Sequence, residues 1–133
     1  MITVELDNFS LKEICQSGQC FRMYETAENT YELIAGDKYL KMTQEGSIVN
    51  FYCSDMEFIC YWVPYFDIDA DYSSYIAKIN PRDTYLVEAA ECGSGIRILQ
   101  QDLWEMIITF LISQQNNISR IRGCVERLCE AYG

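Results

Sequence analysis

The pattern of hydrophobic and polar residues changes near residue 55. Before that point the chain has short runs rich in Tyr, Phe, Ile and Val, a composition typical of β-strands. Gly36-Asp37 and Glu45-Gly46-Ser47 separate the later runs as hairpin turns. These features predict an antiparallel meander with strands over residues 2–6, 20–25, 30–35, 39–43 and 48–53.

A short helix is predicted between the first two strands. Ser10 and Glu13 form the S-x-x-E pattern of a capping box, which marks the start of a helix. Gly18 follows within two turns, and a glycine just beyond the last turn commonly ends a helix. Gly18 has a second interpretation, because glycine also lets a ligand approach the backbone closely. Residue chemistry alone favours the helix end.

Beyond residue 55 the apolar residues recur at helical spacing and the strand signals disappear. Pro64 and Asn80-Pro81 are predicted boundaries between helices. The segment Cys92-Gly93-Ser94-Gly95 lacks the third glycine of a dinucleotide fingerprint, so we interpret it as a linker. Helices are expected over 56–66, 73–79 and 84–91. The order of elements predicts an α+β fold, with an α+β domain at 1–92 and helices of a second domain at 93–133.

The last two predicted helices differ in their pattern. LWEMIITFLIS at 103–113 is apolar nearly all round, which predicts a helix buried on most sides. From Ile118 onward the apolar residues lie on one face and the charged residues on the others, as in a packed surface helix. Asn117 is the predicted N-cap of this helix.

Composition excludes several classes of protein. The chain has 133 residues, half of them apolar, enough for one globular domain or one domain and part of another. No signal peptide and no apolar run of about 20 residues occurs, so we expect a soluble cytoplasmic protein without membrane contact. Seven cysteines without a C-x-x-C pair, and no histidine, argue against a disulfide scaffold and a zinc site. No cofactor is indicated.

Charge gives a contradictory signal. The net charge of −10 argues against nucleic acid, because phosphate binding depends on clustered Lys and Arg.

The spacing of a calcium loop occurs at Asp67, Asp69 and Asp71, but Tyr72 and Lys78 occupy the positions that need glycine and an acidic residue. We therefore expect this segment to be an acidic turn that caps the next helix.

The polar segment QQNNISR at 114–120 leaves two interpretations open. Capping of a helix connection explains one or two of the four amides. Alternatively, a helix N-terminus, several amides and Arg120 form a surface suited to phosphates and base edges. Residue chemistry leaves these interpretations evenly balanced.

Three segments together resemble the 8-oxoguanine DNA glycosylase family. They are SGQCFRM at 17–23, YFDIDADY at 65–72 and the final 39 residues from GIRILQQDLWEM to the end. The resemblance implies a TATA-binding-protein-like antiparallel sheet with helices, then the start of an all-α helix-hairpin-helix glycosylase domain. It also implies a glycosylase/AP lyase of base-excision DNA repair, which flips the damaged purine out of the duplex and attacks the sugar with a lysine amine.

The same resemblance assigns roles to individual residues. It implies that the Gly18 carbonyl reads the N7 proton of the oxidised guanine. Asn116 and Asn117 match two residues of an Asn triplet that lines the gap left by the flipped base, and Gln115 departs from that triplet. Arg120 matches the arginine that contacts the orphaned cytosine.

The resemblance further implies that the catalytic residues are not in this chain. The hairpin, the nucleophilic lysine and the assisting aspartate are expected beyond Gly133, so the chain alone should be inactive. Its expected partners are damaged double-stranded DNA and the C-terminal half of the same enzyme, with a dimer as another way to cover apolar helices. The alternative is a free-standing α+β module that binds protein or nucleic acid without catalysis.

Overall fold

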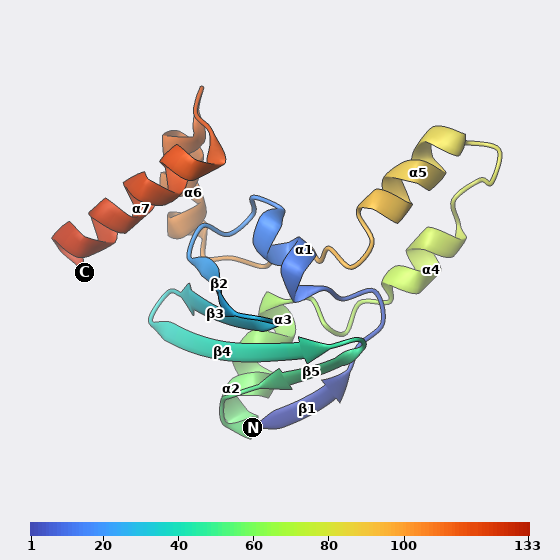
Figure 1. Cartoon of the computed structure of the whole chain (residues 1–133), viewed down its shortest axis with the longest axis horizontal. Helices are drawn as coiled ribbons and strands as arrows, with labels where there is room; N and C mark the ends of the chain where they lie inside the picture. The colour runs from blue at the N-terminus through green and yellow to red at the C-terminus, as the bar shows by residue number, and fades with distance from the viewer.

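The structure, a computed structural model, describes all 133 residues and contains one five-stranded antiparallel sheet. The strands are β1 (Ile2–Glu5), β2 (Met23–Ala27), β3 (Thr30–Ala35), β4 (Lys38–Glu45) and β5 (Ile48–Phe51). Their order in the sheet is β1-β5-β4-β3-β2 (Figure 1). The predicted meander and the α+β fold are therefore confirmed, and β1 joins the sheet by pairing with β5, where Val4 lies opposite Val49.

The buried face of the sheet carries the main core of the molecule. Side chains of a strand alternate between faces, and in β3 Tyr31, Leu33 and Ala35 point into the core. The helix α1 (Leu11–Gln16) adds Leu11 and Ile14 to the same cluster, which contains 18 buried residues. This cluster buries enough apolar surface to stabilise the sheet and α1 as a unit.

Helix α1 has a different start from the predicted capping box. The Ser10 hydroxyl accepts a hydrogen bond from the Glu13 backbone N–H at 3.2 Å, as predicted. The Ser10 backbone N–H, however, donates to the Gly95 carbonyl at 2.8 Å, so Glu13 does not complete the box. A Cβ on Gly95 would lie 2.6 Å from the Ser10 Cβ. The segment interpreted as a linker therefore packs against the start of α1, and only glycine fits at position 95.

The predicted helix at 56–66 exists, but Pro64 does not end it. The chain runs through α2 (Asp55–Glu57), a π-helical turn η1 (Phe58–Trp62) and α3 (Val63–Tyr65). Proline lacks an N–H and suits the first turn of a helix, and Pro64 lies in the first turn of α3, directly after the π-turn. Trp62, the last residue of the π-turn, is fully buried in the core.

Two helical arms extend from the sheet unit on opposite sides, with α1 between them (Figure 1). One arm consists of α4 (Tyr72–Ala77) and α5 (Thr84–Cys92). Asp71 caps α4 by accepting from the Ser74 N–H at 3.0 Å, which confirms the expected acidic cap. The other arm consists of α6 (Leu103–Ser113) and α7 (Ile118–Tyr132). No helix combines the length and apolar composition needed to cross a membrane.

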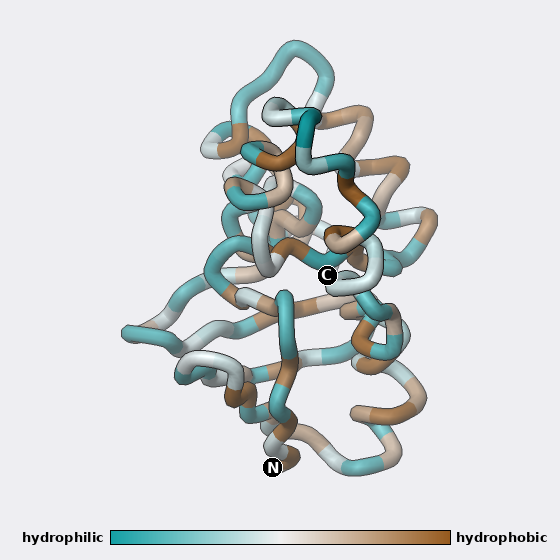
Figure 2. The backbone as a smooth tube through the Cα atoms, turned by 90° about the vertical axis from the view of Figure 1, so that its right-hand side faces the viewer, coloured by the Kyte–Doolittle hydropathy of each residue, from teal (hydrophilic) through white to brown (hydrophobic).

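The prediction that the helix at 103–113 is buried on most sides is wrong. None of the residues of α6 is buried, and Trp104, Phe110 and Leu111 are exposed. Figure 2 shows hydrophobic segments in the helices as well as along the strands. The physical reason is that apolar composition favours burial of a helix but does not supply the surface that buries it. Within this chain, α6 contacts only α7 and the edge of the sheet unit.

Candidate nucleic-acid interface

The loop after α1 and the first turn of α7 meet in space although 100 residues separate them. Gly18 has φ +75°, and a Cβ built on it would lie 3.7 Å from Cδ1 of Ile118. No hydrogen bond within the chain reaches the Gly18 carbonyl. Both predicted roles of Gly18 fit this geometry, because it follows α1 in the left-handed region and has a carbonyl available to a ligand.

Gln19 fixes the backbone beside Gly18. Its side-chain Nε2 donates to the Arg97 carbonyl at 2.8 Å, and its Oε1 accepts from the Leu99 N–H at 3.1 Å. The Gln101 side chain donates to the Gln19 carbonyl at 2.7 Å. These bonds connect the loop to the segment 97–101 and hold its peptide planes in one orientation.

Arg97 in turn holds that segment against the sheet unit. It is 3% exposed, and its guanidinium donates to the carbonyls of Asp7, Asn8, Asp67 and Ala70. Burial lowers the pKa of Arg97, and the neighbouring Tyr72 and Asp67 partly oppose that shift. Four carbonyl partners satisfy the buried charge, which makes Arg97 a structural group.

Arg122 connects α7 to both ends of the Gly18 loop. Its guanidinium donates to the Cys15 carbonyl at 3.0 Å, at the end of α1, and to the Met23 carbonyl at 3.3 Å, at the start of β2. The same group lies 5.7 Å from the ring centre of Tyr24. Arg122 therefore fixes the distance between the Gly18 loop and the first turn of α7.

Three of the four consecutive amides close helix ends. Gln114 and Asn116 donate to the carbonyls of Phe110 and Ile112 at the end of α6. Asn117 accepts from the Arg120 N–H at 3.0 Å, so the predicted N-cap is confirmed. Our expectation that capping explains at most two amides is therefore wrong, because the end of α6 uses two and the start of α7 uses a third.

Gln115 is the amide that capping does not explain. Its side chain is exposed and makes no hydrogen bond within the chain. Its backbone has φ +51°, a left-handed conformation that Asn tolerates better than Gln. This gives a physical reason for an Asn at the position, because the turn between α6 and α7 needs a left-handed residue there.

Arg120 and the amides line a polar hollow beside α7. The hollow has a volume of about 520 Å³, and its lining includes Gln115, Asn116 and Arg120 but not Gly18. Ile118 and Arg120 point to opposite sides of the helix, since residues two apart differ by about 200°. The structure therefore brings the predicted residues to one helical turn, with Gly18 on one side and Arg120 on the other.

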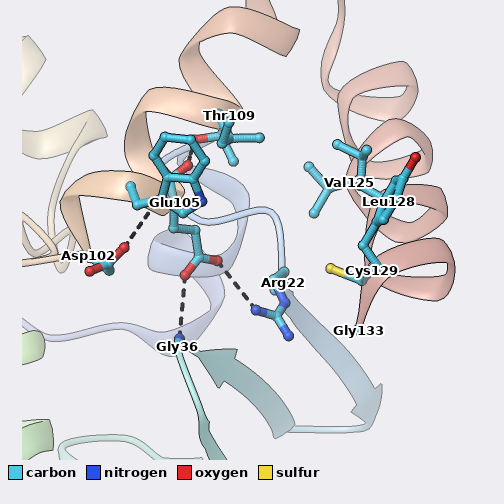
Figure 3. Close-up of a pocket in the computed structure, with 12 residues that line it drawn as sticks. Arg22, Gly36, Asp102, Glu105, Thr109, Val125, Leu128, Cys129 and Gly133 are labelled. Atoms are coloured by element: carbon cyan, nitrogen blue, oxygen red, sulfur yellow. Dashed lines mark hydrogen bonds and ion pairs between the residues drawn. The ribbon is translucent and has the colours of Figure 1, made fainter.

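A second hollow separates α6 from α7. It has a volume of about 440 Å³, and Val125, Leu128 and Cys129 line its α7 side (Figure 3). From the α6 side, Glu105 reaches across to the Gly36 N–H at 3.4 Å and to Arg22 at 3.8 Å. These two polar contacts attach α6 to the sheet unit, while most of its apolar side chains face outward.

Comparison with known proteins identifies the family of this chain. The model of the 8-oxoguanine DNA glycosylase N-terminal domain matches residues 1–107. The chain belongs to the 8-oxoguanine DNA glycosylase family. Within that family, the N-glycosylase/DNA lyase of Saccharomyces cerevisiae is 27% identical over 147 residues, covering 99% of this chain and 39% of the yeast protein.

Solved structures of the glycosylase family have the same fold as this chain. MBOgg1 in complex with a low-affinity DNA ligand matches with a TM-score of 0.92 and 35% identity over 98% of this chain and 46% of that one. The 8-oxoguanine glycosylase/lyase of Clostridium acetobutylicum in its apo form matches with a TM-score of 0.89 and 35% identity, over 97% of this chain and 45% of that one. The same enzyme with double-stranded DNA containing cytosine opposite 8-oxoguanine matches with a TM-score of 0.89 and 36% identity, over 96% of this chain and 44% of that one. The chain spans less than half the length of these relatives.

Sequence reasoning missed the residues that hold the candidate interface together. Gln19, Arg97 and Arg122 act through backbone carbonyls that are distant in sequence, and no local pattern reveals such contacts. The sequence does contain one indication that Arg97 is buried. It lies between Ile96 and Ile98 in an apolar stretch, an unusual place for an exposed charge.

Proposed function

We propose that this chain is the N-terminal portion of an 8-oxoguanine DNA glycosylase/AP lyase of base-excision repair. In this proposal it binds damaged duplex DNA, reads the flipped purine through the Gly18 carbonyl and reads the orphaned cytosine through Arg120. The observation that carries the proposal is that the first turn of α7 has the Gly18 loop against Ile118 on one side and Arg120 with its polar hollow on the other. Neither the Gly18 carbonyl nor the Arg120 guanidinium has a partner within the chain.

The chemistry of N7 explains how one carbonyl distinguishes two bases. Guanine presents a lone pair at N7, which a carbonyl oxygen repels, whereas 8-oxoguanine carries a proton there and donates a hydrogen bond. The Gly18 carbonyl needs a fixed orientation for this, and the bonds of Gln19 supply it. The base must leave the stack to reach the loop, as in other enzymes that act on a base.

The side chains assigned to the gap left by the flipped base differ in whether they already make hydrogen bonds within the chain. Asn116 and Asn117 are engaged in capping, so in this proposal they shape the turn. Gln115 has a free side chain and occupies the gap left by the flipped base. Its amide offers both a donor and an acceptor, and Arg120 adds the contact to cytosine.

The exposed face of α6 supports a further part of the proposal. We infer that the C-terminal half of the same enzyme covers this face and the hollow of about 440 Å³ beside it. That half would also supply the catalytic lysine and aspartate, so the 133 residues alone have neither glycosylase nor lyase activity. A second copy of the chain is the competing partner for the same face. The domain boundary after residue 92 remains our proposal.

The acidic balance fits this division of the enzyme. If the other half provides most contacts to phosphates, this chain binds DNA only weakly and with a small salt dependence. The cytoplasm stays the expected compartment, since all seven cysteines are free thiols, the usual state under reducing conditions.

Binding of the chain to duplexes with an 8-oxoguanine:cytosine or a guanine:cytosine pair tests the function. We expect tighter binding to the damaged duplex, and we expect Gly18→Ala to remove the difference by displacing the carbonyl. Gly46→Ala is the matched control, because Gly46 also has a positive φ, at +60°, and lies in a distant turn with open space around it. Equal binding of wild-type chain to both duplexes favours the free-standing module instead.

Activity is tested separately by borohydride trapping on the damaged duplex. We expect no covalent adduct with the chain alone. A trapped adduct would place the nucleophile within these 133 residues and contradict the proposed division of the enzyme.

A further inference from the structure

Two arginines lie on the same face of α7, two turns apart. Arg120 and Arg127 are seven residues apart, which corresponds to about 10.5 Å along the helix axis. Both line the polar hollow of about 520 Å³. Gly123 lies between them, and a Cβ on it would be 3.5 Å from Nη1 of Arg127. The Arg127 guanidinium therefore extends back over bare helix backbone toward Arg120.

Gly123 is unfavourable for the helix itself. Glycine in a helix interior destabilises it relative to alanine, and no tight packing explains the residue, since Arg127 is the only near neighbour of its missing side chain. The absence of a side chain leaves a groove between the two guanidinium groups. A groove of this kind admits a ligand that needs close approach to the helix.

The charge of the hollow is opposite to that of the chain. Its eight lining residues include two arginines and no carboxylate, although the chain has 20 acidic and 10 basic residues. Three of the other four arginines are engaged within the chain: Arg22 pairs with Glu105, and Arg97 and Arg122 bond to backbone carbonyls. Neither hollow arginine is in an ion pair.

Arg127 has one weak partner within the chain. Its Nη2 donates to the Cys124 sulfur at 3.3 Å, and a thiol sulfur is a poor acceptor. A phosphate oxygen is a much better partner, because the planar guanidinium matches its geometry and charge. Replacement of the Cys124 thiol by a phosphate oxygen as the partner of Arg127 therefore favours binding of the phosphate.

We propose that this hollow binds the DNA backbone next to the orphaned base, with Arg127 contacting a phosphate on that strand. The inference rests on the proposed function, because Arg120 sets the position of the strand. Both arginines line the same hollow, so one DNA strand that enters it contacts both side chains. Arg127 then fixes the position of the strand, while Arg120 reads the base.

Side-chain NMR of the ¹⁵N-labelled chain tests this assignment. A duplex with 8-oxoguanine opposite cytosine should shift the Nε–H signals of both Arg120 and Arg127. Arg82, in the exposed turn between α4 and α5, is the internal control and should not shift. A shift of Arg120 without Arg127 overturns the inference and leaves the proposed function intact. No shift of either signal contradicts both.

Inorganic phosphate distinguishes a DNA backbone site from a site for small anions. At equal phosphate concentration, DNA should shift the Arg127 signal much more than inorganic phosphate does. Equal shifts would assign the hollow to a free anion and overturn the backbone assignment.

Salt dependence of binding gives an independent result. Arg127→Gln should lower the slope of log affinity against log salt by about 1 for every sequence tested. Arg82→Gln changes the net charge equally and should leave the slope unaltered. Gly123→Leu fills the groove yet favours the helix, so it should weaken binding while raising thermal stability. An unchanged slope in Arg127→Gln, or unchanged binding in Gly123→Leu, contradicts the inference.

Discussion

The sheet unit and the α6–α7 arm bury their hydrophobic residues to very different extents. In the sheet unit, 18 buried residues from strands, α1 and the segment around Trp62 form one continuous cluster. In the arm, only Ile121 and Val125 of α7 are buried, together with Phe21 from the loop before β2. The more apolar helix, α6, has no buried residue.

The two regions therefore differ in how much of their apolar surface is covered by other parts of this chain. The sheet unit covers its own apolar face and is stabilised by local contacts. The arm presents apolar side chains outward and carries the polar groups of the proposed DNA interface at its turn. Stability of the chain should therefore depend on the first region, and recognition on the second.

The two tryptophans of the chain give the largest expected contrast. Trp62 is fully buried in the sheet unit, whereas Trp104 on α6 is 69% exposed. We expect Trp62→Ala to lower the free energy of unfolding by about 3–5 kcal/mol and Trp104→Ala to change it by less than about 0.5 kcal/mol. Urea unfolding followed by circular dichroism measures both. Similar losses for the two variants would contradict the comparison.

High pH should destabilise the sheet unit through Tyr31. Burial raises the pKa of Tyr31 to about 12, and Glu25 nearby adds to the shift. The unfolded chain releases this proton near pH 10 while the folded chain retains it, so stability is fully present below pH 10 and falls between pH 10 and 12. Tyr31 contributes to that fall because the unfolded chain binds fewer protons than the folded chain in this pH range.

Tyr31→Phe should make the loss of stability between pH 10 and 12 less steep in urea titrations. Tyr132→Phe, at the exposed end of α7, is the control for removing one hydroxyl. An identical pH dependence in Tyr31→Phe and the wild-type chain would show that this proton does not contribute.

Arg122 is the direct connection between the two regions. Arg122→Gln removes the hydrogen bonds to the Cys15 and Met23 carbonyls and should cost about 1–3 kcal/mol. Hydrogen exchange should become faster in α7 while the strands keep their protection. Arg127→Gln on the same helix is the matched control. Equal acceleration in α7 and in the sheet would mean that the two regions unfold together.

The smallest expected effect concerns the turn between α6 and α7. Gln115 has φ +51°, and Asn accepts this left-handed conformation more readily. Gln115→Asn should therefore raise the free energy of unfolding by less than about 1 kcal/mol, as measured by thermal melting. A loss of stability would show that the long side chain of Gln115 has a packing role that its exposure does not reveal.

The sequence predicts elements that depend on local chemistry. The meander follows from the strand-like runs and hairpin turns, and the cap at Asn117 follows from its position before an amphipathic run. The environment of α6 was not predictable, because an apolar helix pattern does not say which surface covers it. The π-turn before Pro64 and the carbonyl contacts of Arg97 and Arg122 depend on tertiary packing. The family resemblance supplied the roles of Gly18 and Arg120, which residue chemistry left open.

The central claim is that the first turn of α7 reads the base opposite the lesion. Affinities of the wild-type chain and of Arg120→Ala for four duplexes, with each of the four bases opposite 8-oxoguanine, test it most directly. Arg82→Ala serves as the control for loss of one positive charge. We predict that the wild-type chain prefers cytosine and that Arg120→Ala weakens this preference by about 1–3 kcal/mol. An unchanged preference for cytosine in Arg120→Ala would contradict the account.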